Sequence, residues 1–217
     1  MSDRDTLRAV LLDGVSALRL TLAPDAVESL LDYVDLIVEW NAVHNLTAIR
    51  DPAQMVTRHL LDSLAVAPHV QASTLADIGS GAGLPGIPLA LALPALRVWL
   101  VESNGKKARF LQTAVQALKL GNVEVVHARA EAGAGTQRVD IAIARAVASL
   151  EDLVRYAAPW LAPGGALYAM KGPGVHEETA RLPRGWVLHA LHRLAVPGLD
   201  AERNLVVLKR SGPSRSP

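Results

Sequence analysis

Apolar side chains recur every three or four positions through the first part of the chain, over residues 7–18 and again over residues 27–38. This spacing gathers them on one face of a helix. Pro24 fits the first turn of the second helix, and an Asp-Pro pair at positions 51 and 52 predicts the start of a third, which should run to about Val66. The pattern therefore predicts a helical segment over residues 1–70.

From Thr74 the pattern changes to short apolar strands that alternate with helical segments. The predicted strands are 74–78, 97–101, 123–127, 139–144, 166–170, 186–195 and 204–210, and the predicted helices are 86–93, 104–118 and 150–161. Such alternation is typical of a parallel sheet covered on both faces. The last two strands have no helix between them and should pair antiparallel. We expect an α/β core over residues 71–210, the helical segment packed on it, and a disordered tail over 211–217.

Composition excludes several classes of protein. The chain has no cysteine, which rules out disulfides, thiolate metal sites and cysteine nucleophiles. The most apolar stretch, residues 87–96, is short and contains two prolines, so it cannot cross a bilayer. The charged N-terminus has no apolar run behind it and does not resemble a signal peptide. We expect a cytoplasmic protein with no membrane partner.

Charge is unevenly distributed, although the net charge is only +1. Residues 1–69 carry 5 basic and 10 acidic side chains, whereas residues 70–217 carry 17 and 11. The excess of cations in the second part is compatible with a surface that faces RNA, and ordinary surface variation would produce it equally well.

Glycines cluster at the end of the first predicted strand, in the run Asp77-Ile78-Gly79-Ser80-Gly81-Ala82-Gly83. Ligands of open α/β sheets bind outside the carboxyl ends of the strands, and glycines there allow the backbone to approach a ligand closely. Glu102 ends the second strand, where an acid can accept both ribose hydroxyls of an adenosine cofactor. These residues predict a cofactor site.

Two cofactors fit this arrangement. Three glycines, beginning with Gly81, have the G-x-G-x-x-G spacing of a dinucleotide site, although that spacing is common. S-adenosylmethionine (SAM) is favoured by Asp77 within the strand, and by Pro85, which interrupts the turn where a dinucleotide-binding helix offers its N–H groups. A Pro-Gly-Gly turn at 163–165 precedes a strand that is followed by two strands without a helix. The layout predicts a class I SAM-dependent methyltransferase, Rossmann-like and doubly wound, with a purely structural glycine turn as the remaining alternative.

Six blocks of the sequence, all in order, carry a resemblance to a known family. They are Asn45-Leu46-Thr47, Arg58-His59-Leu60-Leu61-Asp62-Ser63, the run from Asp77 to Pro88, Ala144-Arg145-Ala146, Met170-Lys171-Gly172 and Glu202-Arg203-Asn204-Leu205-Val206-Val207. Together they resemble the RsmG family (glucose-inhibited division protein B) over nearly the whole chain. The resemblance implies methylation of guanine nitrogen 7 in the 530 loop of bacterial 16S ribosomal RNA, as naked RNA or in a small-subunit particle. It also implies SAM contacts at Gly79, Leu84, Glu102, Ala130, Glu131 and Arg145. Gly81, in the same glycine loop, is a further predicted contact.

The residues agree with that target. Guanine nitrogen 7 has an unprotonated lone pair, so it can attack a methyl group directly and needs no general base. Consistently, Ala144-Arg145-Ala146 stands where enzymes that methylate exocyclic amines carry Asn/Asp-Pro-Pro-Tyr/Phe. Methylation at cytosine carbon 5 requires a cysteine, which the chain lacks. We expect that no catalytic residue is required beyond alignment of donor and acceptor, with Arg145 as the one candidate.

Cations near the carboxyl edge of the sheet are candidates for RNA contact, with a solvated surface as the alternative: Arg58, Lys106, Lys171 and Arg203. His59 and Asp62 share a helix face beside Arg58, and either contact RNA or join the helical segment to the sheet. No histidine or carboxylate pattern predicts a metal site. Two other functions stay open, a NAD-dependent oxidoreductase and a non-catalytic RNA-binding module.

Overall fold

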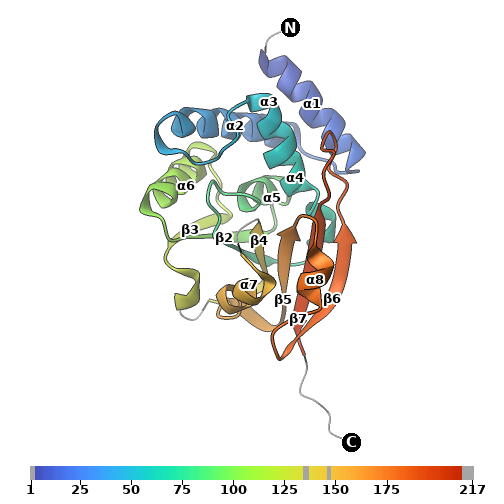
Figure 1. The fold of residues 1–217 in the computed structure, drawn as a ribbon. Coiled ribbons are helices and arrows are strands. Elements are labelled where there is room, and N and C mark those ends of the chain that lie inside the picture. Colours follow the sequence, from blue (N-terminus) through green and yellow to red (C-terminus); the bar gives the residue numbers. More distant parts are fainter. Residues whose placement is uncertain (1–2, 134–136, 146–147, 212–217) are drawn as a thin grey trace, which may run out of the picture.

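The computed structural model describes residues 3–133, 137–145 and 148–211 (Figure 1). Its N-terminal part is helical, with α1 at Asp3–Ala17 and α2 at Pro24–His44. Pro24 stands in the first turn of α2 as expected, and Asn45 ends the helix in a left-handed conformation with a φ of 47°. Ala146 and the tail expected over 211–217, apart from Ser211, lie outside the described residues.

The third predicted helix is not a single α-helix. It consists of α3 (Pro52–Met55), the π-helical segment η1 (Val56–Leu61) and α4 (Asp62–Leu64), followed by a 3-10 turn, η2 (Ala67–His69). The predicted start is correct, because Asp51 accepts a hydrogen bond from the N–H of Ala53 at 3.0 Å. π-Helical turns are frequent at functional sites, and η1 contains Arg58 and His59. Apolar spacing alone does not distinguish such turns from a regular α-helix.

A seven-stranded sheet forms the centre of the molecule (Figure 1). Its strands are β1 (Thr74–Ile78), β2 (Arg97–Glu102), β3 (Val123–His127), β4 (Val139–Arg145), β5 (Leu161–Lys171), β6 (Trp186–Arg193) and β7 (Asn204–Arg210). Their order is β3-β2-β1-β4-β5-β7-β6, in which β7 is antiparallel to both its neighbours and the other pairs are parallel. The predicted parallel sheet with an antiparallel final pair is confirmed. The strand order reverses between β1 and β4, which is where open α/β sheets bind ligands.

The helices after β1 are α5 (Gly86–Ala92), α6 (Gly105–Ala117), η3 (Ala130–Ala132), α7 (Leu150–Ala157) and α8 (Val175–Thr179). The helix predicted over 150–161 ends at Ala157, and β5 starts before its predicted position. The reason is that Leu161 pairs with Val139, so the Pro-Gly-Gly turn forms an irregularity inside β5 rather than a loop before it. Helix α8 was not predicted, because five residues are too few to show a period.

The helical segment and the sheet share one hydrophobic core. Along β1, Leu75 packs in a cluster with the N-terminal helices, while Ala76 faces a second cluster with α7 on the other side. Helix α1 packs closely on the π-helix, since a Cβ on Gly14 would lie only 2.3 Å from Leu61 Cδ1. This contact fixes η1 and the side chains that it carries. Within the described ranges, no helix combines the length and apolar character needed to span a membrane.

Candidate functional site

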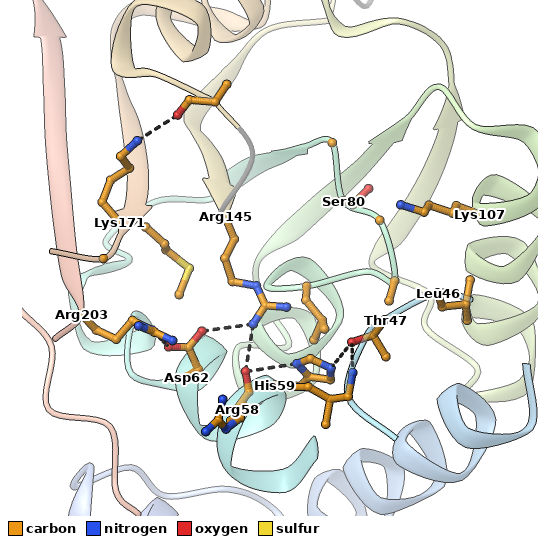
Figure 2. A pocket seen from close by; sticks show the side chains of 18 residues that line it. Leu46, Thr47, Arg58, His59, Asp62, Ser80, Lys107, Arg145, Lys171 and Arg203 are labelled. Atoms are coloured by element: carbon orange, nitrogen blue, oxygen red, sulfur yellow. Dashed lines mark hydrogen bonds and ion pairs between the residues drawn. The ribbon is translucent and has the colours of Figure 1, made fainter. Parts of the chain in front are cut away.

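A cleft of about 680 Å³ opens at the carboxyl edge of the sheet, between the glycine loop after β1 and the π-helix η1 (Figure 2). It lies at the switch point of the strand order. The cleft is lined by Leu46, Thr47, Ile49, Arg58, His59, Asp62, Gly79, Ser80, Gly81, Ala82, Leu84, Lys107, Arg145, Ala148, Met170, Lys171, Gly172 and Arg203.

The glycine loop leaves open space at the position where a ligand would lie. Gly79 has a φ of +71°, and a Cβ built on it would meet no atom within 4 Å. Gly81 has a φ of +60°, and its N–H donates to Glu102 Oε2 at 2.9 Å. The other oxygen of Glu102 accepts the N–H of Asn104 at 2.7 Å. Each carboxylate oxygen can accept more than one hydrogen bond, so Glu102 both holds the loop and keeps acceptor capacity toward a ligand.

Asp77 is fully buried behind the same loop. Its Oδ2 accepts the N–H of Gly86, the first residue of α5, at 2.8 Å, whereas Oδ1 has no hydrogen-bond partner among the described residues. Burial raises the pKa of Asp77 to about 7, against the lowering effects of the Gly86 hydrogen bond and of Arg145. Because the carboxyl group takes the first N–H of α5, that helix end is not free for a pyrophosphate. This geometry argues against the dinucleotide alternative.

A tyrosine of α2 supports the glycine loop from behind. Tyr33 is fully buried, and its hydroxyl donates a hydrogen bond to the carbonyl oxygen of Ala82. Burial raises the pKa of Tyr33 well above its ordinary value, so the phenol remains a donor. Its ring stacks at 6.5 Å, between centroids, on Phe110 of α6. The helical segment thus contributes a direct contact to the loop.

Asp62 lies between two arginine side chains and binds both of them (Figure 2). Its Oδ2 accepts Arg145 Nη1 at 3.1 Å, and its Oδ1 accepts Arg203 Nε at 3.0 Å. Arg145 also donates to the carbonyl oxygen of Arg58 at 3.1 Å. The buried Asp62 therefore joins the helical segment to the end of β4 and to the start of β7, which is the structural alternative that the sequence left open.

His59 is a neutral hydrogen-bonding residue in this structure. Burial, aided by the positive charge of Arg145, lowers its pKa to about 4. Its Nδ1 lies 3.1 Å from the carbonyl oxygen of Arg58, which can only accept, so Nδ1 carries the proton. Its Nε2 then accepts from Thr47 Oγ1 at 2.9 Å. Because both ring nitrogens are engaged, His59 is not free to take a proton from a ligand.

The remaining predicted residues fall inside and outside the cleft lining. Lys171 lines it, and its Nζ binds Glu178 Oε1 and the carbonyl oxygen of Ala148, both at 2.8 Å. The lining excludes Ala130, Glu131, Lys106 and also Glu102, although all four lie at or just after the carboxyl ends of β2 or β3, and Glu102 touches the lining through Gly81. Within the parts of the chain that the structure describes, no group of three or more His, Cys, Asp or Glu could hold a metal ion.

The cations early in α6 are Lys106, Lys107 and Arg109, and by sequence they fit either a solvated face or a phosphate contact; the structure places Lys107, rather than Lys106, in the cleft lining. The spacing of the buried residues distinguishes the two lysines. Lys107 precedes the buried Phe110 and Leu111 by three and four residues, so it lies on the inward face of α6. No local sequence pattern predicts that Asp62, Arg145 and Arg203 meet. Arg145 lies 83 residues and Arg203 lies 141 residues along the chain from Asp62.

The fold and the site define a class. A doubly wound sheet with an antiparallel β7, a glycine loop after β1 and an acid at the end of β2 is the layout of class I SAM-dependent methyltransferases. The chain is similar to a solved putative methyltransferase, yhhF from Escherichia coli, with 20% identity and a TM-score of 0.52 over 71% of this chain and 87% of that chain. It is also similar to a mutant of MtNAS in complex with S-adenosylmethionine, with 16% identity and a TM-score of 0.56 over 83% and 75% of the chains. At such identities the likeness shows the fold alone.

Sequence comparison identifies the family. Residues 26–206 match the family described as GidB, rRNA small subunit methyltransferase G. The ribosomal RNA small subunit methyltransferase G of Xanthomonas campestris pv. campestris (strain 8004) is 52% identical over 202 residues, which are 93% of this chain and 94% of that protein. The chain belongs to the rRNA small subunit methyltransferase G family, a family of methyltransferase enzymes. Membership confirms the resemblance seen in the sequence and favours a methyltransferase over an oxidoreductase or a non-catalytic binding module.

Proposed function

We propose that the protein methylates nitrogen 7 of a guanine in the 530 loop of bacterial 16S ribosomal RNA, with SAM as the methyl donor. The observation that carries the proposal is the cleft, in which a glycine loop held by Glu102 faces a wall of cationic side chains. The relative from Xanthomonas campestris is named for methylation of small-subunit ribosomal RNA, and one structural neighbour was solved with SAM. A ribosomal substrate implies a reaction in the cytoplasm.

The residues present fit SAM. The open space beside Gly79 allows a ligand to lie against the backbone, and Glu102, only 7% exposed, has acceptor capacity for the ribose hydroxyls. In a buried setting, hydrogen bonds to a charged group are stronger than those between neutral groups. The other proposed contacts are Gly81, Leu84, Ala130, Glu131 and Arg145, of which Ala130 and Glu131 lie in η3 at the same edge of the sheet.

The proposed reaction asks the protein for alignment rather than for proton transfer. When bound, SAM supplies an electrophilic methyl group, whose bond to sulfur breaks as the lone pair of nitrogen 7 forms the new bond. No proton leaves nitrogen 7, so no residue has to act as a base. The engagement of both ring nitrogens of His59 agrees with this requirement. Alignment of donor and acceptor can lower a barrier by ~7–11 kcal/mol.

The cations at the cleft differ in their availability for RNA phosphates. Arg58 is exposed, and none of the ion pairs found among the described residues involves it. Lys171 and Arg203 are already paired with Glu178 and Asp62, so a phosphate has to share them with a carboxylate. We therefore propose that Arg58 contacts phosphate directly, and that Lys171 and Arg203 contact RNA while keeping their intramolecular partners.

The test is transfer of a labelled methyl group from SAM to 16S ribosomal RNA that lacks the modification, presented both as naked RNA and in small ribosomal subunits. We expect label at nitrogen 7 of one guanine of the 530 loop, mapped after chemical cleavage at 7-methylguanine. Comparison of the two substrates identifies the form that the enzyme uses. Label at another base, or no label on either substrate, would show that the proposal is wrong.

A further inference from the structure

A second, smaller hollow lies next to the cleft, between the end of α2 and the start of α6. It has a volume of about 120 Å³ and is lined by Trp40, His44, Lys106 and Arg109. Residues near one another in the chain line the two depressions: Lys107 lines the cleft and Lys106 the hollow, and Leu46 lines the cleft two residues after His44, which lines the hollow. A strand of RNA that leaves the cleft on this side would meet the hollow first.

The wall of the hollow carries a fixed aromatic ring. The half-buried Trp40 lies 5.5 Å from Phe110, between ring centroids, in an edge-on arrangement, and Phe110 is fully buried. The His44 ring lies 5.2 Å from the Trp40 ring, between centroids, in a tilted arrangement. Because the core holds the indole, it can receive a planar ring at little cost in side-chain entropy. Unpaired RNA bases are recognised by stacking on such side chains.

Cations border the ring, and among the described residues no carboxylate forms an ion pair with them. Lys106 and Arg109 are exposed, and the ion pairs found in the described parts of the chain include neither of them nor Lys107. Helix α6 itself contains no acidic residue. By contrast, Arg145, Lys171 and Arg203 each have a carboxylate partner. The hollow therefore combines a stacking surface with positive charge that is free to meet phosphate.

We propose that this hollow binds one unpaired nucleotide of the substrate RNA next to the target guanine, with its base stacked on Trp40 and its phosphates contacted by Lys106 and Arg109. The inference rests on the proposed function, since it assumes an RNA substrate. The small volume suits a single planar base rather than a second cofactor. Single-stranded RNA is the occupant, because a base inside a duplex cannot present its face to a side chain.

The test compares binding of an unmodified 16S fragment that contains the 530 loop across a salt series. Trp40→Leu should raise the Kd about 5- to 150-fold, the range that loss of one stacked base produces. Trp40→Phe, which keeps an aromatic plane, should stay within about threefold of the unchanged protein. Lys106→Ala with Arg109→Ala should lower the slope of log K against log salt by about 1.4, or ~0.7 for each contact to a single strand. SAM affinity should not change in any of these variants.

The matched control neutralises two cations at the opposite edge of the sheet, through Lys119→Asn with Arg184→Ala. Asparagine is chosen because Lys119 has a φ of +53°, which asparagine tolerates. The control should keep the salt slope of the unchanged protein. If Trp40→Leu melts at a much lower temperature, the exposed pair Lys106 and Arg109 decides the question alone.

The outcomes separate the two proposals. Failure of the unchanged protein to methylate any small-subunit RNA would refute the proposed function. Methylation by the unchanged protein, with wild-type Kd and salt slope in Trp40→Leu and in the double cation variant, would refute only the nucleotide site. Loss of activity on whole subunits without any change in binding to the naked fragment would mean that this surface meets a ribosomal protein, and would also overturn the site.

Discussion

Asp62 offers the sharpest test of how the cleft is held together. The substitution Asp62→Asn keeps the size of the side chain but removes the charge that Arg145 and Arg203 share. Both guanidinium groups would then face an amide, which can accept from only one of them and which presents a donor to the other. We expect a loss of folding stability together with increased mobility of the two arginines.

The size of the stability loss follows from how deeply Asp62 and its two partners are buried. The Asp62 side chain is 4% exposed, while those of Arg145 and Arg203 are 18% and 29% exposed. Removing one partner of a fully buried ion pair costs ~3–5 kcal/mol, and hydrogen bonds to charged groups contribute ~1.5–3 kcal/mol each. Because both arginines can turn partly toward water, the lower end applies, and we expect the free energy of unfolding to fall by ~3 kcal/mol.

Urea unfolding followed by circular dichroism measures this change, with an unchanged m value as the sign that the unfolding transition itself is the same. Asp13→Asn, which neutralises an exposed carboxylate on α1, is the matched control and should alter stability by no more than ~0.5 kcal/mol. A double-mutant cycle with Arg203→Met isolates the coupling between the two side chains. A fall in stability of less than ~1 kcal/mol, the range of surface salt bridges, would refute the reasoning.

Three further predictions concern the glycine loop and its surroundings. Since burial raises the pKa of Asp77 to about 7, the native state keeps a proton that the unfolded state releases, so stability should fall as pH rises from about 4 to 7. Asp77→Asn should remove that part of the slope in urea titrations at several pH values, and identical slopes would contradict it. Glu102→Ala should weaken SAM binding by ~1–3 kcal/mol in calorimetry, and an unchanged Kd would remove Glu102 from the proposed site. Gly79→Val should abolish SAM binding, because its side chain would enter the open space at a φ of +71°; retained micromolar affinity would show that the loop is only structural.

The local pattern of apolar residues was sufficient to predict much of the fold. The strands at Thr74–Ile78, Val123–His127 and Asn204–Arg210 have the predicted bounds, because apolar runs bounded by turns or charge mark a buried strand directly. The π-helix within residues 56–61 was not predictable in this way. Its apolar positions fit regular helical spacing, and its close packing on α1 at Gly14 is a tertiary contact that this spacing does not report.

The candidate site likewise has one part that the sequence predicts and one part that it does not. Gly79 and Gly81 follow β1 and Glu102 ends β2, so their meeting follows from the topology of a parallel sheet, in which the carboxyl ends of neighbouring strands share one edge. The pairing of Arg145 and Arg203 with Asp62 depends instead on how the helical segment docks on the sheet. No spacing along the chain reports that docking. The sequence therefore offers Arg145 as a SAM contact and Arg203 as an RNA contact without revealing that the two already share a carboxylate.

The hydrogen bond from Tyr33 to Ala82 makes the ligand loop and helix α2 part of one cooperative unit. Local opening of the loop breaks a contact of α2, and fraying of α2 removes a support of the loop. A ligand that binds only the closed loop stabilises every element that must open together with it, in proportion to its concentration relative to its dissociation constant. The backbone amides of α2 should consequently exchange more slowly with solvent when a ligand occupies the loop. This is expected although Tyr33 contacts the loop rather than the ligand.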